Sequence, residues 1–282
     1  MKKIDTFMFN NELSVLGVRL EALYKHVDLF ILVESGISHL GRAKKLHYWE
    51  NRDLFSKYAD KIVYKNAKLT EAPGWPMENQ QRYIISKYLK ELDLEDGDLI
   101  LNSDCDEIPR WQLFREAASH PYCFFNQMYF IYHSDLFTNK CVTGTAAVRY
   151  GVLKQLDDSY QGRGLQALRN SKDNHAILED GGHHYSYFGS VQTISDKSRS
   201  IAEGSLTSAK NAPEEIEKQR QEALTTLKSP YSPRRLRKMN LEDSEAIISY
   251  TTARNGSWHD AEGIWTIKPD VSMETLLKLA AP

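Results

Sequence analysis

The sequence predicts an α/β fold, and three consecutive segments near the start of the chain are the reason. Residues Ile4–Phe9 indicate a first strand. Leucine and valine then recur at helical spacing over Leu13–Val27, with the pair Asn10–Asn11 available as an N-cap. Leu29–Val33 (LFILV) is a continuous apolar run, which is typical of a strand covered on both faces. A strand–helix–strand opening of this kind predicts a parallel sheet.

The same alternation continues along the chain. Lys61–Tyr64 indicates a short strand, and the apolar residues of Ile84–Leu92 mark a helix that begins near Glu78. Leu99–Leu101 is another short strand, and Trp111–Ser119 is predicted to be helical. Helices are therefore expected on both faces of the sheet.

Beyond residue 120 the pattern changes. Strands are expected at Cys123–Tyr132, which is rich in aromatic residues, at Thr145–Tyr150, and at His183–Phe188 behind a double glycine. Helices are expected from Thr193 and over Glu214–Leu227, where an apolar stripe recurs at helical spacing. The later part of the chain therefore continues the sheet and ends in helices.

Length and composition limit the class of protein. The 282 residues suit one large domain with an appendage, and we expect a core over residues 1–205 and a helical C-terminal extension over residues 206–282 packed on it. A formal net charge of −2, with no long basic run, argues against a nucleic-acid partner. Three cysteines without a CxxC pair argue against a disulfide framework or a zinc cluster. With no signal peptide and no apolar stretch of 18 residues, we expect a cytoplasmic protein without a transmembrane segment.

The segment LILNSDCDEIP (Leu99–Pro109) places three carboxylates directly after a short apolar strand. In an open α/β sheet, ligands bind beyond the carboxyl ends of the strands, which is where Asp104 and Asp106 fall. Two carboxylates one residue apart can face one hard cation, and Mg²⁺ or Mn²⁺ often shares such ligands with substrate phosphates. The alternative is that the acidic residues cap the following helix at its positive end. The spacing alone leaves both interpretations open.

Six segments of the chain together match the pattern of one known family. They are FNNELSVLGVRLEAL (Phe9–Leu23), VDLFILVES (Val27–Ser35), GRAKKLHYWEN (Gly41–Asn51), ENQQR (Glu78–Arg82), SDCDEIP (Ser103–Pro109) and GGHHYSYFG (Gly181–Gly189). On these motifs the chain resembles the family 17 glycosyltransferases, which include the enzyme that adds the bisecting N-acetylglucosamine to N-glycans. It departs from the family at His183, which replaces a tryptophan, and after Lys197, where SRSIAEGS replaces a His-x-Glu pattern.

The resemblance implies a GT-A type fold, in which a Rossmann-like mixed sheet is flanked by helices. It also implies a UDP-sugar donor, by analogy UDP-GlcNAc, a divalent cation (Mn²⁺ or Mg²⁺) and inversion at the anomeric carbon. The acceptor would be a glycan or a glycolipid. Without the membrane anchor of the eukaryotic members, this chain resembles a bacterial or viral version that is cytoplasmic or peripheral to a membrane.

The resemblance also assigns a metal site. Asp104, Asp106 and His184 are the expected ligands, with Asp106 binding the cation directly. An imidazole behind the double glycine could complete the shell of the cation beside the diphosphate. The alternative for His184 is a buried histidine bonded to a carbonyl. For Glu107 the alternative to a role in the site is a charge at a helix N-terminus.

The residues expected to bind the donor are Glu34, Arg82, Asp104 and Lys197. Arg82 could face the diphosphate, or it could form a helix-surface ion pair with Glu78 four residues earlier. Lys197 has the alternative of a solvated helix lysine. Glu34 ends a core strand, where a buried carboxylate is costly without a partner, and it could instead be purely structural. The arginines that could pair with it are Arg19, Arg42 and Arg82.

An inverting transfer needs a carboxylate that takes the proton of the acceptor hydroxyl. The candidates for this catalytic base are Glu203, Asp180 and Glu179, and Glu203 is preferred from its position after Lys197. Three aromatic residues, Trp75, Trp111 and Tyr129, could stack on sugar rings, but aromatic residues at such spacings are more often part of the core.

We therefore predict a metal-dependent, inverting glycosyltransferase that moves a sugar, by analogy GlcNAc, from a UDP-sugar to a glycan hydroxyl. One rival is a sugar-phosphate nucleotidyltransferase. A glycine-rich, lysine-bearing loop after the first strand would favour this rival, but FNNELS has neither glycine nor lysine. A rival of another class is a catalytically inactive carbohydrate-binding or scaffold protein on the same frame. The two departures from the family pattern leave this second rival open.

Overall fold

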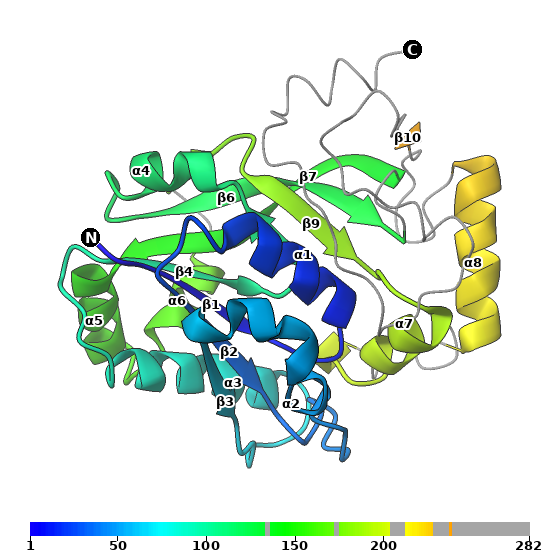
Figure 1. Ribbon diagram of the computed structural model, residues 1–282, viewed down its shortest axis with the longest axis horizontal. Coiled ribbons are helices and arrows are strands. Elements are labelled where there is room, and N and C mark those ends of the chain that lie inside the picture. Colours follow the sequence, from blue (N-terminus) through cyan, green and yellow to red (C-terminus); the bar gives the residue numbers. More distant parts are fainter. Residues whose placement is uncertain (133–135, 172–174, 204–211, 228–236, 239–282) are drawn as a thin grey trace.

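A mixed sheet of ten strands forms the centre of the structure, a computed structural model that describes residues 1–132, 136–171, 175–203, 212–227 and 237–238 (Figure 1). The strand order is β3-β2-β1-β4-β7-β6-β9-β5, with β8 paired to β6 and β10 paired to β7. The strands are β1 (Lys3–Met8), β2 (Leu29–Glu34), β3 (Ile62–Asn66), β4 (Leu99–Asp104), β5 (Glu107–Pro109), β6 (Tyr122–Ile131), β7 (Leu136–Arg149), β8 (Ala176–Leu178), β9 (Gly182–Ser186) and β10 (Arg237–Lys238).

Helices flank this sheet, so the predicted α/β class with a mixed sheet between helices is confirmed. The helices are α1 (Leu13–Leu23), α2 (His47–Glu50), α3 (Trp75–Leu89), α4 (Phe114–Ala117), α5 (Tyr150–Ser159), α6 (Gly164–Asn170), α7 (Val191–Ser198) and α8 (Pro213–Thr226), together with 3₁₀ segments at Arg52–Lys61 and Trp111–Leu113.

The strands β3, β2, β1 and β4 run parallel and are covered on both faces. Alternate side chains of β2 show how the two faces are filled. Phe30 and Leu32 belong to the core that also contains the apolar residues of α1, whereas Ile31 and Val33 belong to the core that contains those of α3. All four are fully buried, as the continuous apolar run predicts.

The acidic turn, residues 104–107, joins β4 to β5, and these two strands are far apart in the order of the sheet. In the sheet, β4 pairs with the antiparallel strand β7. Beyond β7 lie β6, β9 and finally β5, which forms the edge. Yet β5 follows β4 after only Cys105 and Asp106, a connection that spans no more than about 11 Å. The sheet therefore curls, so that its edge strand returns to the end of β4. The turn lies where the sheet closes on itself.

The start of the first helix differs from the prediction. Glu12, rather than one of the two asparagines, occupies the N-cap position of α1. The side-chain amide of Asn10 donates to Ser200 Oγ at 2.5 Å. The side-chain amide of Asn11 donates to the backbone carbonyl of Thr193 at 2.9 Å. The asparagines therefore tie the first loop to the region of α7, which local sequence could not indicate.

Other predicted elements have different bounds. Helix α3 begins at Trp75 rather than near Glu78, because Gly74 turns the chain with a φ of +96° and Pro76 fits the first helical turn. Strand β4 extends to Asp104, so the first aspartate ends the strand. The predicted strand at 145–150 is the end of the longer β7, and Tyr150 begins α5. The predicted helix at 111–119 is a 3₁₀ turn followed by α4.

The C-terminal part of the described chain packs on the end of the sheet. Ile194 of α7 and Ile216 and Ala223 of α8 form a small buried cluster with Ile131 of β6. The domain boundary predicted between residues 205 and 206, and most of the predicted extension, lie outside the described residues. Within the described part, no helix has the length and apolarity needed to cross a bilayer.

Candidate active site

A cavity of about 560 Å³ opens where β1 and β4 end. Its lining comes from the acidic turn, from the first turns of α3, and from α6, β9 and α7, which are distant in the sequence. A cleft beyond the carboxyl ends of parallel strands is the expected place for a ligand in an open α/β sheet. The volume is also in the range of small-molecule sites.

Arg19, fully buried on α1, holds the acidic turn in position. Its Nε and Nη2 donate to the two carboxylate oxygens of Asp5 on β1, at 2.8 and 2.6 Å. Its Nη1 donates to the backbone carbonyls of Asp104 and Glu107 at 3.1 and 2.8 Å, and Nη2 also reaches Ser103 Oγ at 2.6 Å. Because a buried guanidinium is costly without partners, these bonds and the fold of the turn depend on each other.

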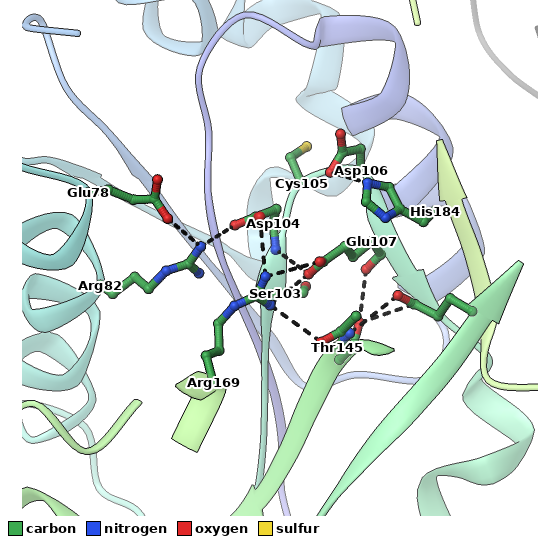
Figure 2. A network of polar contacts seen from close by, with 12 residues as sticks. Glu78, Arg82, Ser103, Asp104, Cys105, Asp106, Glu107, Thr145, Arg169 and His184 are labelled. Atoms are coloured by element: carbon green, nitrogen blue, oxygen red, sulfur yellow. Dashed lines mark hydrogen bonds and ion pairs between the residues drawn. The ribbon is translucent and has the colours of Figure 1, made fainter. Parts of the chain in front are cut away.

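Asp104 lies between two arginines that reach it from different helices (Figure 2). Arg82 Nη2 donates to Oδ1 at 2.7 Å and also to Glu78 Oε1 at 3.1 Å. Arg169 Nη2 donates to Oδ2 at 3.3 Å. Burial acts to raise the pKa of the Asp104 carboxyl, but Arg82 and Arg169 together lower this pKa below its ordinary value. The carboxylate is therefore ionised at neutral pH.

Asp106 has a different set of partners. Lys197 Nζ donates to its Oδ2 at 2.7 Å and also pairs with Glu12 Oε1 at 2.7 Å. His184 Nε2 lies 3.6 Å from Oδ1. Burial acts to raise the pKa of Asp106, but Lys197 and His184 lower it below its ordinary value. Burial acts to lower the pKa of His184, but Asp106 raises it above its ordinary value.

Glu107 belongs to the same network rather than to a helix cap. Arg169 binds its carboxylate through both terminal nitrogens, at 2.8 and 3.0 Å, and the backbone N–H of Asp104 donates to it at 2.9 Å (Figure 2). Glu107 begins β5, so the interpretation of the acidic residues as a helix cap does not hold. Sequence reasoning missed Arg169, because the short segment of α6 carries no clear periodicity.

The two histidines of β9 point to opposite faces of the strand, as neighbouring strand residues do. His184 lines the cavity beside Tyr129, with the ring centroids 4.9 Å apart. His183 packs against Phe130 and Tyr185 and does not line the cavity. Burial, together with the nearby Arg110, lowers the pKa of His183 to about 3, so its ring is neutral at physiological pH.

The remaining predicted residues differ in how close they lie to the cavity. Lys197, Arg82 and Glu203 line it, and Glu203 is exposed. Asp180 does not line the cavity, and its carboxylate pairs with Arg110 at 2.8 Å. Glu179 does not line it either and accepts a hydrogen bond from Asn126 at 2.6 Å.

Glu34 lies fully buried behind the lining, where none of the predicted arginines is its partner. Lys44 Nζ, which lines the cavity, is 3.7 Å from its Oε1, and the backbone N–H of Tyr48 donates to the same oxygen at 3.2 Å. Burial raises the pKa of Glu34 against the opposing effect of Lys44. The expected arginine pairing is corrected, because Arg19 is bound to Asp5 and Arg82 to Asp104.

The acidic turn offers part of a metal site rather than a complete one. In the described residues, no group of three His, Cys, Asp or Glu side chains has the geometry of a metal-binding cluster. Mg²⁺ is commonly held by one or two carboxylates together with substrate phosphates and water, so two carboxylates fit a cation that binds with its substrate. The side chain of Asp104 is 39% exposed, which leaves it accessible from the cavity.

Comparisons with known proteins place the chain in a family. The profile of glycosyltransferase family 17 matches residues 1–205, and the chain belongs to that family, so it is a glycosyltransferase. No curated protein sequence matches the chain.

The similar solved structures are distant. The glycosyltransferase GlyE of Streptococcus pneumoniae TIGR4 is 13% identical (64% of this chain, 46% of that chain, TM-score 0.32). An active-site mutant of LgtC is 10% identical (63% and 72%, TM-score 0.33). A 4-diphosphocytidyl-2C-methyl-D-erythritol synthase is 14% identical (63% and 89%, TM-score 0.39).

Proposed function

We propose that this glycosyltransferase moves a sugar from a UDP-sugar, UDP-GlcNAc by analogy with its family, to a hydroxyl of a glycan or glycolipid, with inversion and with a divalent cation. One observation carries the proposal. The carboxylates of Asp104 and Asp106 meet the cationic groups of Arg82, Arg169 and Lys197 at the inner end of one cavity. Carboxylates suit a hard cation, and guanidinium and ammonium groups suit a diphosphate.

The balance of charge supports the need for a cation. The carboxylates of the network are Glu12, Glu78, Asp104, Asp106 and Glu107, and its cationic side chains are Arg82, Arg169 and Lys197. With both of its histidines neutral, His39 beside Glu78 and His184 beside Asp106, the described network has a net charge of −2. A diphosphate would add more negative charge, so it would be repelled unless a divalent cation enters with it.

The residues have distinct roles in the proposed reaction. Asp104 and Asp106 would hold Mn²⁺ or Mg²⁺, which when bound supplies Lewis-acid stabilisation of the leaving diphosphate. Arg82, which lines the cavity beside Asp104, would donate to the diphosphate. Glu203 is the proposed base, and its place in the cavity lining supports it over Asp180 and Glu179. It would take the proton of the acceptor hydroxyl as the oxygen attacks the anomeric carbon.

Calorimetric binding of UDP, UDP-GlcNAc and GDP-mannose, each with Mn²⁺ or with EDTA, tests the proposal. We expect the uridine compounds to bind only with Mn²⁺, and Asp106→Asn to weaken this binding at least about tenfold, because one carboxylate ligand is lost. Glu179→Gln is the matched control, a carboxylate outside the cavity lining, and should bind as the wild type does.

Each part of the proposal can fail separately. Binding that persists in EDTA would refute the metal requirement, and the absence of nucleotide binding would refute the donor and favour the inactive-frame alternative. Proton NMR of the first sugar released by slow hydrolysis of UDP-GlcNAc tests the stereochemistry, since inversion of the α-linked donor gives the β-anomer first.

A further inference from the structure

We infer that Trp75 forms a stacking platform for a pyranose ring of the acceptor, at the mouth of the cavity. The inference rests on the proposed function, because it assumes that the inner end of the cavity holds the donor. It assigns a subsite to a residue outside the charged network and names the chemical class of its ligand, a sugar ring.

Trp75, Trp111 and Tyr129 were the candidates for stacking on a sugar ring, and the structure gives them different surroundings. The ring of Trp111 stacks on His26, with centroids 3.7 Å apart and planes 3° apart, and it does not line the cavity. Tyr129 lines the cavity, but its ring packs against His184. Trp75 lines the cavity, is 52% exposed, and has no aromatic ring against it among the described residues. Only Trp75 of the three therefore combines an open ring with a place in the lining.

A second exposed tryptophan shows why exposure alone would not suffice. Trp49 is 47% exposed, but its ring stacks on Tyr64 with centroids 5.3 Å apart, and the guanidinium of Arg52 lies 4.4 Å from its centroid. It does not line the cavity. Trp49 therefore has partners within the protein, whereas the apolar surface of Trp75 is exposed to the cavity, where it is costly unless a ligand covers it.

The position of Trp75 on α3 points to the acceptor rather than to the donor. Trp75, Glu78 and Arg82 follow one another at spacings of three and four residues, so they share one face of the helix, and all three line the cavity. Arg82 contacts Asp104, which marks the diphosphate end. At a rise of 1.5 Å per residue, Trp75 lies about 10 Å farther along the helix, roughly two sugar rings from that end. Arg82 is 2% exposed and Trp75 52%, so this face of the helix leads from the interior to the surface.

The backbone around Trp75 is fixed, which keeps the entropy cost of stacking low. The N–H of Gly74 donates to the carbonyl of His39 at 2.5 Å, and Gly74 adopts a φ of +96°, which glycine accepts more readily than other residues. Pro76 restrains the first turn of the helix. An indole on this backbone offers a flat apolar face that matches the C–H face of a pyranose.

The test uses the full chain loaded with Mg²⁺ and UDP and a panel of methyl glycosides of glucose, galactose, mannose and GlcNAc. Saturation-transfer NMR reports which sugar protons contact the protein. We expect at least one glycoside to bind through its ring C–H face, Trp75→Ala to weaken that binding at least about fivefold, and Trp75→Phe to restore part of it. Trp49→Ala, at a residue of similar exposure outside the lining, should bind as the wild type does. Binding of UDP should be unchanged in all three variants.

The other outcomes overturn the inference in distinguishable ways. Equal loss of UDP and UDP-GlcNAc binding in Trp75→Ala would mean that the ring stacks on the nucleotide. Loss of UDP-GlcNAc binding with UDP unchanged would place the donor sugar on it. Glycoside binding that does not depend on Trp75, or no glycoside binding, would leave no acceptor platform at this residue. Failure of the wild type to bind any uridine nucleotide would instead refute the proposed function.

Discussion

The chain before the acidic turn and the chain after it contribute to the site in different ways. The earlier part supplies the strand that ends in Asp104 and, 22 residues before it, the arginine that binds this aspartate. The later part supplies Arg169 and Lys197, which lie 65 and 91 residues from the carboxylates they bind. Local periodicity therefore places the carboxylates, while tertiary structure places most of their counter-charges. Three substitutions test this contrast, in order of decreasing effect on stability.

Arg19→Met should have the largest effect, because it removes the tie between the earlier part and the turn. It leaves Asp5 as a buried, unpaired carboxylate and removes a donor from three backbone carbonyls of the turn. We expect the free energy of unfolding to fall by about 3–5 kcal/mol, measured by urea denaturation. Lys57→Ala is the control, since its ion pair with Glu21 is on the surface and should contribute about 1 kcal/mol or less. If Arg19→Met lost no more unfolding free energy than the control, the fold of the acidic turn would not depend on Arg19.

Gly182→Ala should disturb the later part, where β9 holds the edge strand β5. Gly182 has a φ of +117°, and an added Cβ would lie 2.2 Å from the carbonyl oxygen of Ile108. We expect a loss of about 2–3 kcal/mol of unfolding free energy, together with weaker nucleotide binding because the turn shifts. Gly97→Ala, with open space around its Cβ, should be close to neutral. Unchanged stability in Gly182→Ala would show that the pairing of β5 with β9 accommodates the added methyl group without loss of unfolding free energy.

His183→Phe should have the smallest effect and a characteristic pH dependence. The pKa of His183 is lowered to about 3 in the folded chain, below the ordinary value of 6.5. The unfolded chain therefore binds more protons as the pH falls below 6.5, and this residue makes the wild type less stable there. We compare the free energy of unfolding of His183→Phe with that of the wild type at each pH. This difference should shift in favour of the variant by about 1 kcal/mol between pH 7.5 and pH 5.5. The same relative stability at both pH values would show that folding leaves the pKa of His183 unchanged.

Much of the fold was predictable from the sequence because it depends on local patterns. The opening strands and helix follow from apolar periodicity, and Asp104 and Asp106 follow from a short motif after an apolar strand. Family motifs led to His184 and Lys197, which the structure brings beside Asp106. In these cases the informative residues are close in sequence or belong to a known pattern.

The rest could not be read locally, because it is decided by contacts between distant segments. Arg19 is one cation on an apolar helix face, and nothing nearby in the sequence indicates Asp5 and the turn as its partners. Arg169 follows β7 in a helix too short to produce a clear pattern, yet it binds both Asp104 and Glu107. The partner of Glu34 is a lysine, where an arginine was expected.

The curl of the sheet also sets an order in time. A ribosome makes the chain from its N-terminus, so the acidic turn is complete long before β9, to which β5 pairs through Glu107 and His184. Until residue 184 has been made, β5 has no strand to join, and until residue 197 has been made, Asp106 has no lysine beside it. The acidic turn of this enzyme is therefore synthesised about midway through the family-matched region, and Lys197, which pairs with Asp106, follows 91 residues later.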